Sequence, residues 1–487
     1  MNRKQTNSPC VAVVGGGISG LAAAHRLVEL DPACRVAVFD PAGRPGGVLS
    51  TVHEDGFQVE RSADNFITTF PWGLALCSRL GLQDELIQTT PEYRRTFVVR
   101  RGRLYKLPDG FLMMAPARMW PMAVTPILSP WGKLRAAMEY FIPPRRDEAD
   151  ESMASFVRRR LGREVFERLV EPLVSAVYAA DMERLSLDAT LSRFREMERE
   201  HGSLIRAMRR AMKSSRHAKE SGARYSMFVT LRRGLSSLVD ALAARLPPGA
   251  LRLGAEVRRL ERADDAWRLS LAGRGPAAGP PAAETFDAVI LAAPSHVSAE
   301  LLRPVDPEAA ADLAAVEHSG TAIVTLAFAR DEVGHPLDGM GAVVPAIEQS
   351  PILAVSFSSQ KYAHRAPDGK VLLRAFAGGA RRHELAEMPE QELLPLVLGE
   401  LRPLLRIGRE AKPCYVNTAH WPRTMPQYHV GHRERIGRVL ARVAALPNLE
   451  LAGNALEGVG IPNCIHTGES AAERILAAAG ARTGSNA

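Results

Sequence analysis

The chain has 487 residues, of which 46% are hydrophobic and 24% are charged. This composition is typical of a globular protein with a sizeable core and excludes a disordered or fibrous chain. The net charge is +8, and only eight of the 62 basic residues are lysines. Arginine binds carboxylates and phosphates through its planar fork. The chain has no long basic tract and no basic residues interleaved with aromatics, which argues against nucleic acid as a partner.

A βαβ unit is predicted at the start of the chain. Residues 10–14 form a short apolar run typical of a buried strand, a glycine-rich turn follows, and an Ala/Leu-rich helix extends to about Leu30. A second strand over 35–39 ends at Asp40. The apolar run 11–27 contains four glycines, so we interpret it as strand, turn and helix and expect no signal peptide.

Shorter patterns predict the remaining elements. A hairpin is expected over 51–59 around the turn dipeptide Asp55-Gly56. A helical stretch covers about 148–220, a Gly/Pro/Ala loop covers 273–283, and a final helix covers about 468–479. Further strands are expected at 251–257, 267–271, 286–293, 322–329, 371–377 and 449–452. The runs near 286 and 449 resemble the strands of the opening unit, which predicts a discontinuous first domain.

The segment 111–131 is apolar, but four prolines and Arg118 interrupt it. A membrane-spanning helix needs about 20 uninterrupted apolar residues, so we expect no transmembrane helix here. Two interpretations stay open: the segment lies in the plane of a membrane surface, or it forms an internal apolar layer over a pocket. The side chains that would contact a membrane are Met113, Met114, Trp120, Met122 and Trp131.

No metal site and no disulfide framework are predicted. The five cysteines are odd in number, far apart and without a C-x-x-C pair, which favours a reducing compartment. The histidines lack metal-ligand spacing, and we assign no side chain the role of catalytic acid or base. These histidines are His318, His420, His429, His432 and His466.

The pattern Gly15-x-Gly17-x-x-Gly20 at the strand-to-helix junction predicts dinucleotide binding. The glycines permit a tight turn and a close approach of the backbone to a diphosphate, and the helix N-terminus attracts the phosphates. Asp40 lies twenty residues after Gly20, where a carboxylate accepts hydrogen bonds from ribose hydroxyls. Arg44-x-Gly46-Gly47 follows, and this extension resembles the glutathione-reductase-type flavoproteins of the amine oxidase superfamily.

A second glycine-rich turn, over residues 451–465, precedes the final helix. Gly453, Gly458 and Gly460 permit close backbone approach, and the helix after them again points its N-terminus inward. This arrangement suits a flavin ring, because backbone N–H groups stabilise negative charge on the reduced ring. The block contains no aromatic residue, whereas an aromatic pair facing the flavin is expected there in an amine oxidase.

Six segments in order along the chain resemble the protoporphyrinogen/coproporphyrinogen oxidase family, the FAD-containing, oxygen-dependent enzymes of haem biosynthesis. Together they extend the resemblance from residue 11 to about 475, and the segment 171–186 is the most specific of them. The segments are 14–21, 62–67, 171–186, 339–345, 421–432 and 453–465.

The resemblance implies one non-covalent FAD per chain. Asp40 stands where the family usually has Glu, and Ser62-Ala63 stand where Gly-Pro is common; Cys464 is not expected to attach the flavin covalently. The implied FAD contacts are Gly15, Gly16, Gly17, Ile18, Ser19, Gly20, Asp40, Arg44, Gly47, Val48, Ser62, Ala63, Asp64, Asn65, Val257, Trp421, Val459, Gly460 and Ile461. The implied substrate contacts are Arg95, which would pair a propionate, and Met340, Gly341 and Val343.

The resemblance also implies the reaction, a six-electron oxidation of a porphyrinogen in three two-electron cycles that release hydrogen peroxide. We favour protoporphyrinogen IX as the substrate and keep coproporphyrinogen III as the alternative, because the stretch 110–140 looks more like the coproporphyrinogen-using branch. More distant alternatives are another flavin amine oxidase, a carotenoid-type desaturase, or a non-enzymatic binder like the escort proteins of prenylated GTPases.

The expected architecture is mixed α/β with a Rossmann-like FAD domain of the glutathione-reductase/amine-oxidase type, assembled from 8–75, 222–300 and 436–485. A sheet-containing substrate domain would cover 301–435 with about 76–91, and a helical domain over 92–221 would face the membrane. We expect a cytoplasmic protein with peripheral membrane contact and a ferrochelatase as a candidate recipient of the product.

Overall fold

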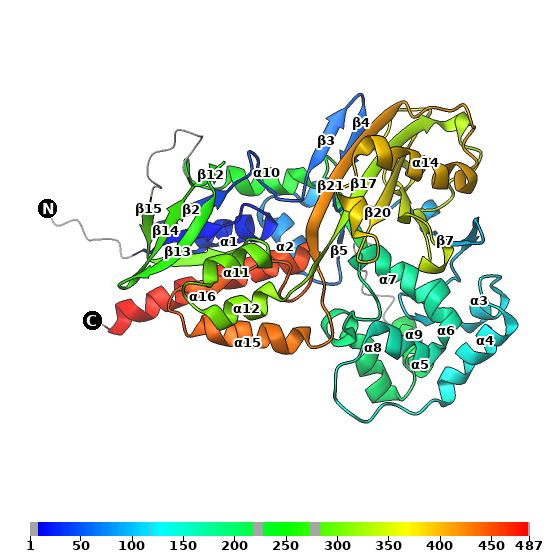
Figure 1. Cartoon of the computed structure of the whole chain (residues 1–487), viewed down its shortest axis with the longest axis horizontal. Coiled ribbons are helices and arrows are strands. Elements are labelled where there is room, and N and C mark those ends of the chain that lie inside the picture. Colours follow the sequence, from blue (N-terminus) through cyan, green and yellow to red (C-terminus); the bar gives the residue numbers. More distant parts are fainter. Residues whose placement is uncertain (1–7, 117, 218–226, 273–282, 486–487) are drawn as a thin grey trace.

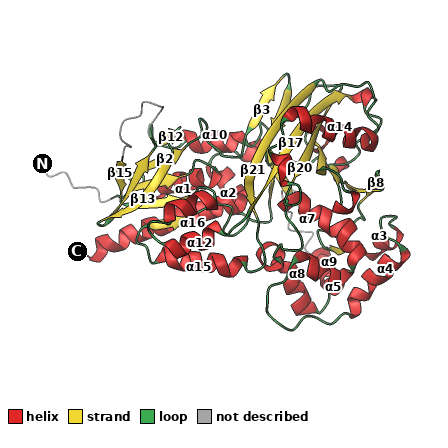
Figure 2. Cartoon of the chain, viewed as in Figure 1, coloured by secondary structure: helices red, strands yellow, loops and turns green. Residues whose placement is uncertain are grey.

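The structure is a computed structural model of the chain, and it describes residues 8–116, 118–217, 227–272 and 283–485. Two large sheets and a group of helices make up the molecule (Figure 1). The parallel sheet with its covering helices occupies one end. The second sheet and the helical region lie side by side at the other end, where the helices fill the lower right of the view (Figure 2).

The parallel sheet contains five strands, and every neighbouring pair runs parallel. In spatial order the strands are β12 (Leu251–Leu253), β2 (Arg35–Asp40), β1 (Cys10–Val14), β16 (Ala288–Leu291) and β22 (Leu449–Leu451). The opening βαβ unit is therefore confirmed, and the expected runs near 286 and 449 pair beside it. The domain boundaries themselves stay predictions.

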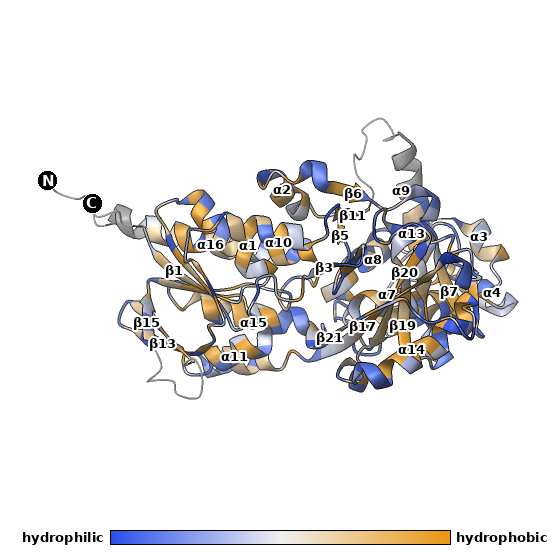
Figure 3. Ribbon diagram, turned by 90° about the horizontal axis from the view of Figure 1, so that it is seen from above, coloured by the Kyte–Doolittle hydropathy of each residue, from blue (hydrophilic) through white to orange (hydrophobic). Residues whose placement is uncertain are grey.

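Strand β1 alternates its side chains between two apolar layers, which explains its uninterrupted apolar sequence. Val11 and Val13 face a helical layer, and Ala12 and Val14 face the opposite layer; apolar colouring runs along β1 in Figure 3. The helical layer consists of α1 (Ile18–Leu30), α2 (Trp72–Arg79), α10 (Ser236–Ala244) and α16 (Ile461–Ser485). The opposite layer consists of the antiparallel strands β13 (Val257–Ala263), β14 (Ala266–Leu271) and β15 (Ala283–Phe286) with α11 (Ser295–Leu302), α12 (Pro307–Ala314) and α15 (His432–Ala444).

Two expected elements differ from the structure. The strand predicted over 251–257 is divided into β12 and β13, because Gly254 with φ of +66° turns the chain between them. The final helix begins at Ile461 and not near residue 468. Part of the loop expected at 273–283 lies outside the described residues.

The second sheet has seven strands, antiparallel except for the parallel pair β18 and β7. Leu373 and Ala375 of β20 pack under α14 (Glu390–Leu405), whereas Leu372 and Arg374 point to the opposite face. The strands in spatial order are β21 (Tyr415–Pro426), β17 (His318–Ala329), β20 (Lys370–Gly378), β19 (Ile352–Phe357), β18 (Gly341–Val343), β7 (Thr96–Arg100) and β8 (Arg103–Lys106). Strands β7 and β8 lie in this sheet although the expected helical domain includes their residues.

The helical region packs around its own apolar core, which includes Phe156, Leu169 and Phe194. Its helices are α3 (Met119–Val124), α4 (Pro130–Ala137), α5 (Met153–Leu161), α6 (Arg163–Val165), α7 (Glu171–Tyr178), α8 (Leu187–His201) and α9 (Leu204–His217), with a π-helical turn at Phe166–Val170 and a 3₁₀ turn at Met138–Phe141. The segment 111–131 forms the short strands β9 (Phe111–Leu112) and β10 (Ala115–Pro116), then α3 and the start of α4.

Smaller elements connect the regions. The predicted hairpin is present as the antiparallel pair β3 (Thr51–Glu54) and β4 (Phe57–Glu60). The remaining strands are β5 (Phe66–Ile67), β11 (Phe228–Leu231) and β6 (Leu86–Gln88), which form a small sheet, and the remaining short helix is α13 (Ser358–Lys361). Short 3₁₀ turns lie at Gln83–Glu85, Pro91–Tyr93, Arg330–Glu332, Ala346–Glu348 and His383–Ala386.

Candidate cofactor and substrate site

Two glycines of the first turn bring β1, β16 and α1 into close contact. At Gly15, φ is +114°, and a Cβ there would lie 2.7 Å from the carbonyl oxygen of Ala292. A Cβ at Gly20 would lie only 1.8 Å from the carbonyl oxygen of Gly15. The protein's own packing therefore requires glycine at both positions.

Gly17, between them, faces open space. No protein atom lies within 4 Å of the position that its Cβ would take. It is the N-cap residue of α1 and, as a glycine, supplies no side chain to accept a hydrogen bond from the first turn of this helix. Unsatisfied N–H groups and the positive end of the helix dipole together form a site for an anion such as a diphosphate.

The carboxylate of Asp40 lies directly beside this turn. Gly16 donates its N–H to Oδ2 at 2.6 Å, and Ala42 donates to Oδ1 at 2.8 Å. Each oxygen retains lone pairs that can accept ribose hydroxyls. The N–H of Ala255 donates to the Asp40 carbonyl at 2.9 Å, which brings the start of β13, at Val257, next to the end of β2.

Arg44 organises the loop that covers the first turn. Its guanidinium donates to the carbonyl oxygens of Gly47 at 2.7 Å and Leu49 at 3.0 Å. The N–H of Gly46 donates to the carbonyl oxygen of Gly16 at 2.8 Å, so this loop and the glycine turn are joined. Val48 in the same loop is 40% exposed.

Two arginines, Arg44 and Arg61, lie near this loop. Neither Arg44 nor Arg61 forms an ion pair with the residues that the structure describes, and the Nε of Arg61 is buried without a hydrogen-bond partner. Burial lowers the pKa of Arg44, and the nearby charge of Arg61 lowers it further, whereas the carboxylate of Asp40 offsets a part of this effect. This mutual repulsion would be relieved by a bound anion.

The C-terminal turn reaches the same edge of the parallel sheet. The N–H of Ala452 donates to the carbonyl oxygen of Leu291 at 2.9 Å. A Cβ at Gly468 would lie 2.2 Å from the carbonyl oxygen of Ser19, so α16 packs tightly against α1, as Figure 1 shows. Val459 and Gly460 immediately precede the first residue of α16, Ile461. Both helix N-termini therefore begin at this edge.

Two stacked aromatic side chains, Tyr428 and His432, contact the C-terminal turn. The Tyr428 hydroxyl donates to the carbonyl oxygen of Asn454, and the Tyr428 ring stacks on His432 with 4.0 Å between ring centroids. His432 is 1% exposed, and burial lowers its pKa to about 4, so the ring is neutral. Sequence analysis gave neither residue a role, although both lie in a segment that carries the family resemblance.

Residues 62–65 form a loop between the β3–β4 hairpin and the face of the seven-stranded sheet. Trp421 Nε1 donates to the carbonyl oxygen of Arg61 at 2.5 Å. Arg374 donates to the carbonyl oxygen of Ser62, and Lys361 Nζ lies 3.0 Å from Asp64 Oδ2. The structure thus places the predicted cofactor residues of this loop beside Trp421.

Lys361 and Arg374 were missed by the sequence analysis. Arg374 gave a usable signal, because it is the one charged residue inside the apolar run 371–377 and is only 1% exposed. A charged side chain in a central strand indicates a buried, paired charge.

The predicted substrate residues lie where β7 and β18 run parallel. Met340 donates its N–H to the Arg95 carbonyl oxygen at 2.7 Å, and Gly341 pairs with Thr96. The Arg95 guanidinium lies 3.3 Å from Asp338 Oδ2, and the Arg95 side chain is 53% exposed. Val343 is buried against the core of the helical region.

The glycine turns, Asp40 and the two arginines Arg44 and Arg61 fit a flavin dinucleotide. The open space at Gly17 and the uncapped N-terminus of α1 fit its diphosphate. The backbone N–H groups before Ile461 fit a ring that becomes electron-rich on reduction.

Comparisons with known proteins agree with this fit. A family model described as "Flavin containing amine oxidoreductase" matches residues 18–476. The chain belongs to this flavin-dependent family. A coproporphyrinogen III oxidase of Propionibacterium freudenreichii subsp. freudenreichii is 37% identical, over 97% of this chain and 92% of the relative. A chloroplastic protoporphyrinogen oxidase of Nicotiana tabacum is 31% identical, over 94% of this chain and 83% of the relative.

A solved structure confirms the predicted fold of this flavin oxidoreductase. The structure, of a candidate protoporphyrinogen oxidase from Exiguobacterium sp. 255-15, superposes with a TM-score of 0.84 at 30% sequence identity and covers 96% of this chain and 98% of its own. The predicted enzyme class, an oxidoreductase of the coproporphyrinogen/protoporphyrinogen oxidase group, is also confirmed.

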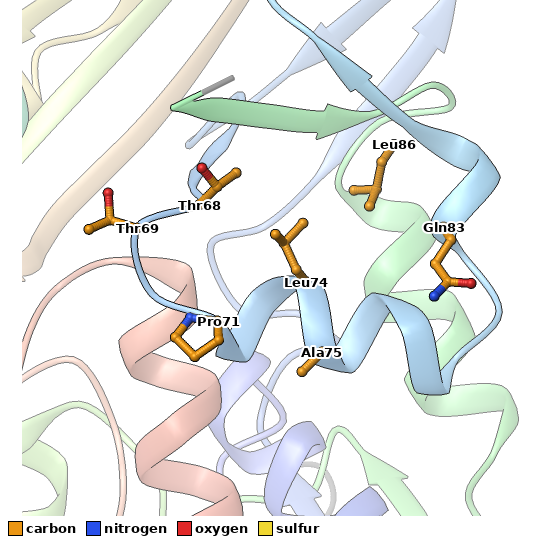
Figure 4. Close-up of a pocket in the computed structure, with 7 residues that line it drawn as sticks. All are labelled: Thr68, Thr69, Pro71, Leu74, Ala75, Gln83 and Leu86. Carbon is orange, nitrogen blue, oxygen red and sulfur yellow. The ribbon is translucent and has the colours of Figure 1, made fainter. Parts of the chain in front are cut away.

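One hollow of about 440 Å³ lies beside α2 of the flavin oxidoreductase. Figure 4 shows it between α2 and the small sheet of β5, β11 and β6. It is lined by Thr68, Thr69, Pro71, Leu74, Ala75, Gln83 and Leu86. None of the predicted cofactor or substrate residues lines it, so its position gives no support for a role in the reaction.

The described residues contain no group of three or more His, Cys, Asp or Glu side chains that could hold a metal ion. All five cysteines of the flavin oxidoreductase are free thiols. Within the same residues, no helix is long and apolar enough to cross a membrane.

Proposed function

We propose that the protein oxidises coproporphyrinogen III to coproporphyrin III with dioxygen, using one non-covalent FAD per chain. The observation that supports this substrate is the 37% identity to a coproporphyrinogen III oxidase over 97% of the chain, against 31% to a protoporphyrinogen oxidase. Sequence analysis favoured protoporphyrinogen IX, and the comparisons favour its alternative.

The reaction balances as one porphyrinogen and three dioxygen molecules giving one porphyrin and three hydrogen peroxide molecules. Bound FAD supplies a hydride acceptor that dioxygen reoxidises. The chain's own residues bind and orient: the turn at Gly17 would hold the diphosphate, Asp40 the ribose, and the loop 62–65 with Trp421 a wall of the ring site. No side chain is assigned as acid or base.

Non-covalent attachment is supported by the state of Cys464. This thiol is buried, and burial raises its pKa to about 11. A thiol attacks as the thiolate, so Cys464 is a poor nucleophile near neutral pH. We expect acid precipitation of the protein to release all of the flavin into the supernatant.

The carboxylates of the substrate suit an arginine-rich protein. Coproporphyrinogen carries four propionates and protoporphyrinogen two, and Arg95 would pair one of them. A propionate would compete with Asp338, which already lies 3.3 Å from this guanidinium.

The decisive experiment supplies each porphyrinogen separately and follows porphyrin fluorescence. We expect kcat/KM to be higher for coproporphyrinogen III, and anaerobic addition of that substrate to bleach the flavin absorbance. Higher kcat/KM with protoporphyrinogen IX would contradict the proposed substrate. A protein that purifies without flavin absorbance and cannot be loaded with FAD would favour the escort-type alternative.

We also propose peripheral contact with an anionic membrane surface. Three large apolar side chains of the helical region are highly exposed: Trp120 is 76% exposed, Trp131 is 78% exposed and Phe141 is 79% exposed. They lie on α3, on α4 and in the adjoining 3₁₀ turn, at the edge of the molecule that Figure 1 shows at the lower right. Exposed tryptophans with nearby cations are typical of surfaces that insert into lipid headgroups.

A further inference from the structure

A buried group of charges lies behind the loop 62–65, on the face of the seven-stranded sheet opposite α14. Lys361 Nζ lies 3.1 and 3.0 Å from the two carboxylate oxygens of Asp64, and Arg374 Nη1 lies 3.4 Å from Oδ2. Arg374 also donates to the carbonyl oxygen of Ser62. Asn65 donates to Asp64 Oδ1 at 2.7 Å. Lys361 and Arg374 thus make four polar contacts to this short loop.

The neighbouring pair Arg365 and Glu60 completes the group. Arg365 Nη1 lies 3.7 Å from Glu60 Oε1, and both side chains are 3% exposed. The group therefore contains three cations, counting Lys361 and Arg374, and two carboxylates, counting Asp64. One positive charge is therefore left in excess within this group.

Several donors in this group have no hydrogen-bond partner. They belong to arginines that are almost fully buried: Arg374 is 1% exposed and Arg365 is 2% exposed. Arg374 Nε has no hydrogen-bond partner, and the nearest carboxylate oxygens to Arg374 Nη1 and Arg365 Nη1 lie at ion-pair distances of 3.4 and 3.7 Å and form no hydrogen bond with them. A buried donor without an acceptor lowers the stability of the folded protein. Stabilising the contact between two regions is therefore not a sufficient explanation for this group of charges.

We propose that Lys361 and Arg374 are positioning residues, which fix the loop 62–65 against the seven-stranded sheet through Asp64 and the Ser62 carbonyl and place an excess positive charge behind this loop. The inference rests on the proposed FAD site, because this loop is the wall of that site. The charge would favour the electron-rich, reduced cofactor over the oxidised one. It would therefore make the flavin easier to reduce.

The first test measures the affinity of the apoprotein for FAD by quenching of flavin fluorescence. We expect Lys361→Met and Arg374→Gln each to raise the Kd by about tenfold to hundredfold, because each loses charge-assisted hydrogen bonds that hold the loop. Lys361→Arg, which keeps the charge and can donate to Asp64, should recover much of the affinity. This measurement needs no enzyme activity.

The second test measures the midpoint potential of the bound flavin. We expect the charge-removing variants to show a lower potential, and Arg374→Lys to keep the parent potential while weakening FAD binding. Arg374→Lys retains the charge but loses the fork that reaches both Ser62 and Asp64. An unchanged potential in Arg374→Gln would contradict the electrostatic part of the proposal.

Controls separate positioning from general stability. Arg184→Met removes an exposed ion pair with Glu317 and should leave FAD affinity and potential unchanged. Breaking one side of a buried pair can unfold a protein, so the double variant Asp64→Asn/Lys361→Met removes both charges together. If this folded double variant and Arg374→Gln bind FAD as the parent does, the loop needs no such positioning and the proposal is wrong. A parent protein that binds FAD but oxidises neither porphyrinogen would contradict only the proposed function.

Discussion

Gly17 and Gly20 lie three residues apart in one turn, yet only one of them is required by the protein's own packing. A methyl group at Gly20 meets the backbone of Gly15 at 1.8 Å, whereas a methyl group at Gly17 meets no protein atom within 4 Å. We expect Gly20→Ala to lower the free energy of unfolding of the apoprotein by about 1–3 kcal/mol or more. We expect Gly17→Ala to change it by less than about 1 kcal/mol but to weaken FAD binding at least about tenfold.

Urea unfolding of the apoprotein and fluorescence titration with FAD separate these two effects. Gly43→Ala is the matched control, because a methyl group there also meets no protein atom within 4 Å and the residue lies outside the glycine turn. It should change neither quantity. Parent-like FAD affinity in Gly17→Ala would exclude this turn as the diphosphate site.

Arg95 forms an ion pair with Asp338, and in the proposed substrate site a propionate would displace this carboxylate. We expect Arg95→Ala to raise KM by about tenfold to hundredfold, the equivalent of about 1.5–3 kcal/mol for a charge-assisted hydrogen bond, with a smaller change in kcat. Asp338→Asn frees the guanidinium and should lower KM or leave it unchanged. Steady-state kinetics by porphyrin fluorescence measures both. A KM unaffected by Arg95→Ala would remove this residue from the substrate site.

At the scale of single elements, His432, the first residue of α15, makes the free energy of unfolding depend on pH. The folded pKa of His432 is lowered by burial to about 4 from an ordinary value of 6.5. Between these values the unfolded chain binds a proton that the folded chain does not, so stability falls as pH drops through 6.5 toward 4. His432 alone would contribute a loss of about 2 kcal/mol between pH 8 and pH 5.

The variant His432→Phe isolates this contribution, since phenylalanine can keep the stack on Tyr428 but does not titrate. We expect the difference in unfolding free energy between pH 8 and pH 5 to be smaller in the variant by about 2 kcal/mol. Urea unfolding at the two pH values provides the measurement. His318 has its pKa lowered to about 4 in the same way, so a part of the parent's pH dependence remains. An unaltered difference would show that His432 is not the titrating group.

Local patterns predicted the elements whose signal lies within one stretch of chain. The strand–glycine–helix–strand order of residues 10–40 and the hairpin at Asp55-Gly56 are of this kind, and both are present. The boundary at Gly254 was missed, because a single glycine between two alternating runs also occurs within strands. The start of α16 was missed because Gly458, Gly460 and Pro462 resemble a loop, whereas proline is well tolerated in the first turn of a helix.

The candidate site was predictable where backbone geometry alone defines it. Glycine turns and the acid at Asp40 leave a pattern in sequence. Lys361 and Arg374 contact Asp64 from positions about 300 residues away in the sequence. A pattern within one stretch of sequence cannot predict that these residues lie close together. Such contacts follow from the tertiary fold, which brings α13, β20 and the loop 62–65 together.

For the whole molecule, the exposed apolar side chains of the helical region predict reversible binding to anionic vesicles. Arg118, Lys133 and Arg146 lie in or next to the same segments, and none has an ion-pair partner among the residues that the structure describes. We expect the triple variant Trp120→Ser/Trp131→Ser/Phe141→Ser to lose most vesicle binding, since each large apolar side chain contributes about 1.5–3 kcal/mol when buried.

Co-sedimentation with vesicles that contain or lack anionic lipid, at low and at high salt, measures this binding. The control variant is Leu396→Ser, which removes a 43% exposed apolar side chain from α14 and should bind as the parent does. Raised salt should weaken the binding by screening the cations. A parent protein that stays in the supernatant with anionic vesicles at low salt would contradict the membrane proposal.

The close contact between Gly468 and Ser19 joins two helices that are synthesised at opposite ends of the chain. The nucleotide site can therefore be completed only after nearly the whole chain has been synthesised. The glycine turn after β1 leaves the ribosome early, but β22 and α16, which close the same edge of the sheet, follow more than 400 residues later. At roughly 5–20 residues per second, that delay is about 20–90 s. For this interval the nascent chain carries half of a nucleotide site, with an apolar strand edge beside it that needs protection from other chains. Flavin loading is therefore expected to be a late event, and a chain that ends before β22 would lack both the last strand of the sheet and the helix N-terminus that completes the nucleotide site.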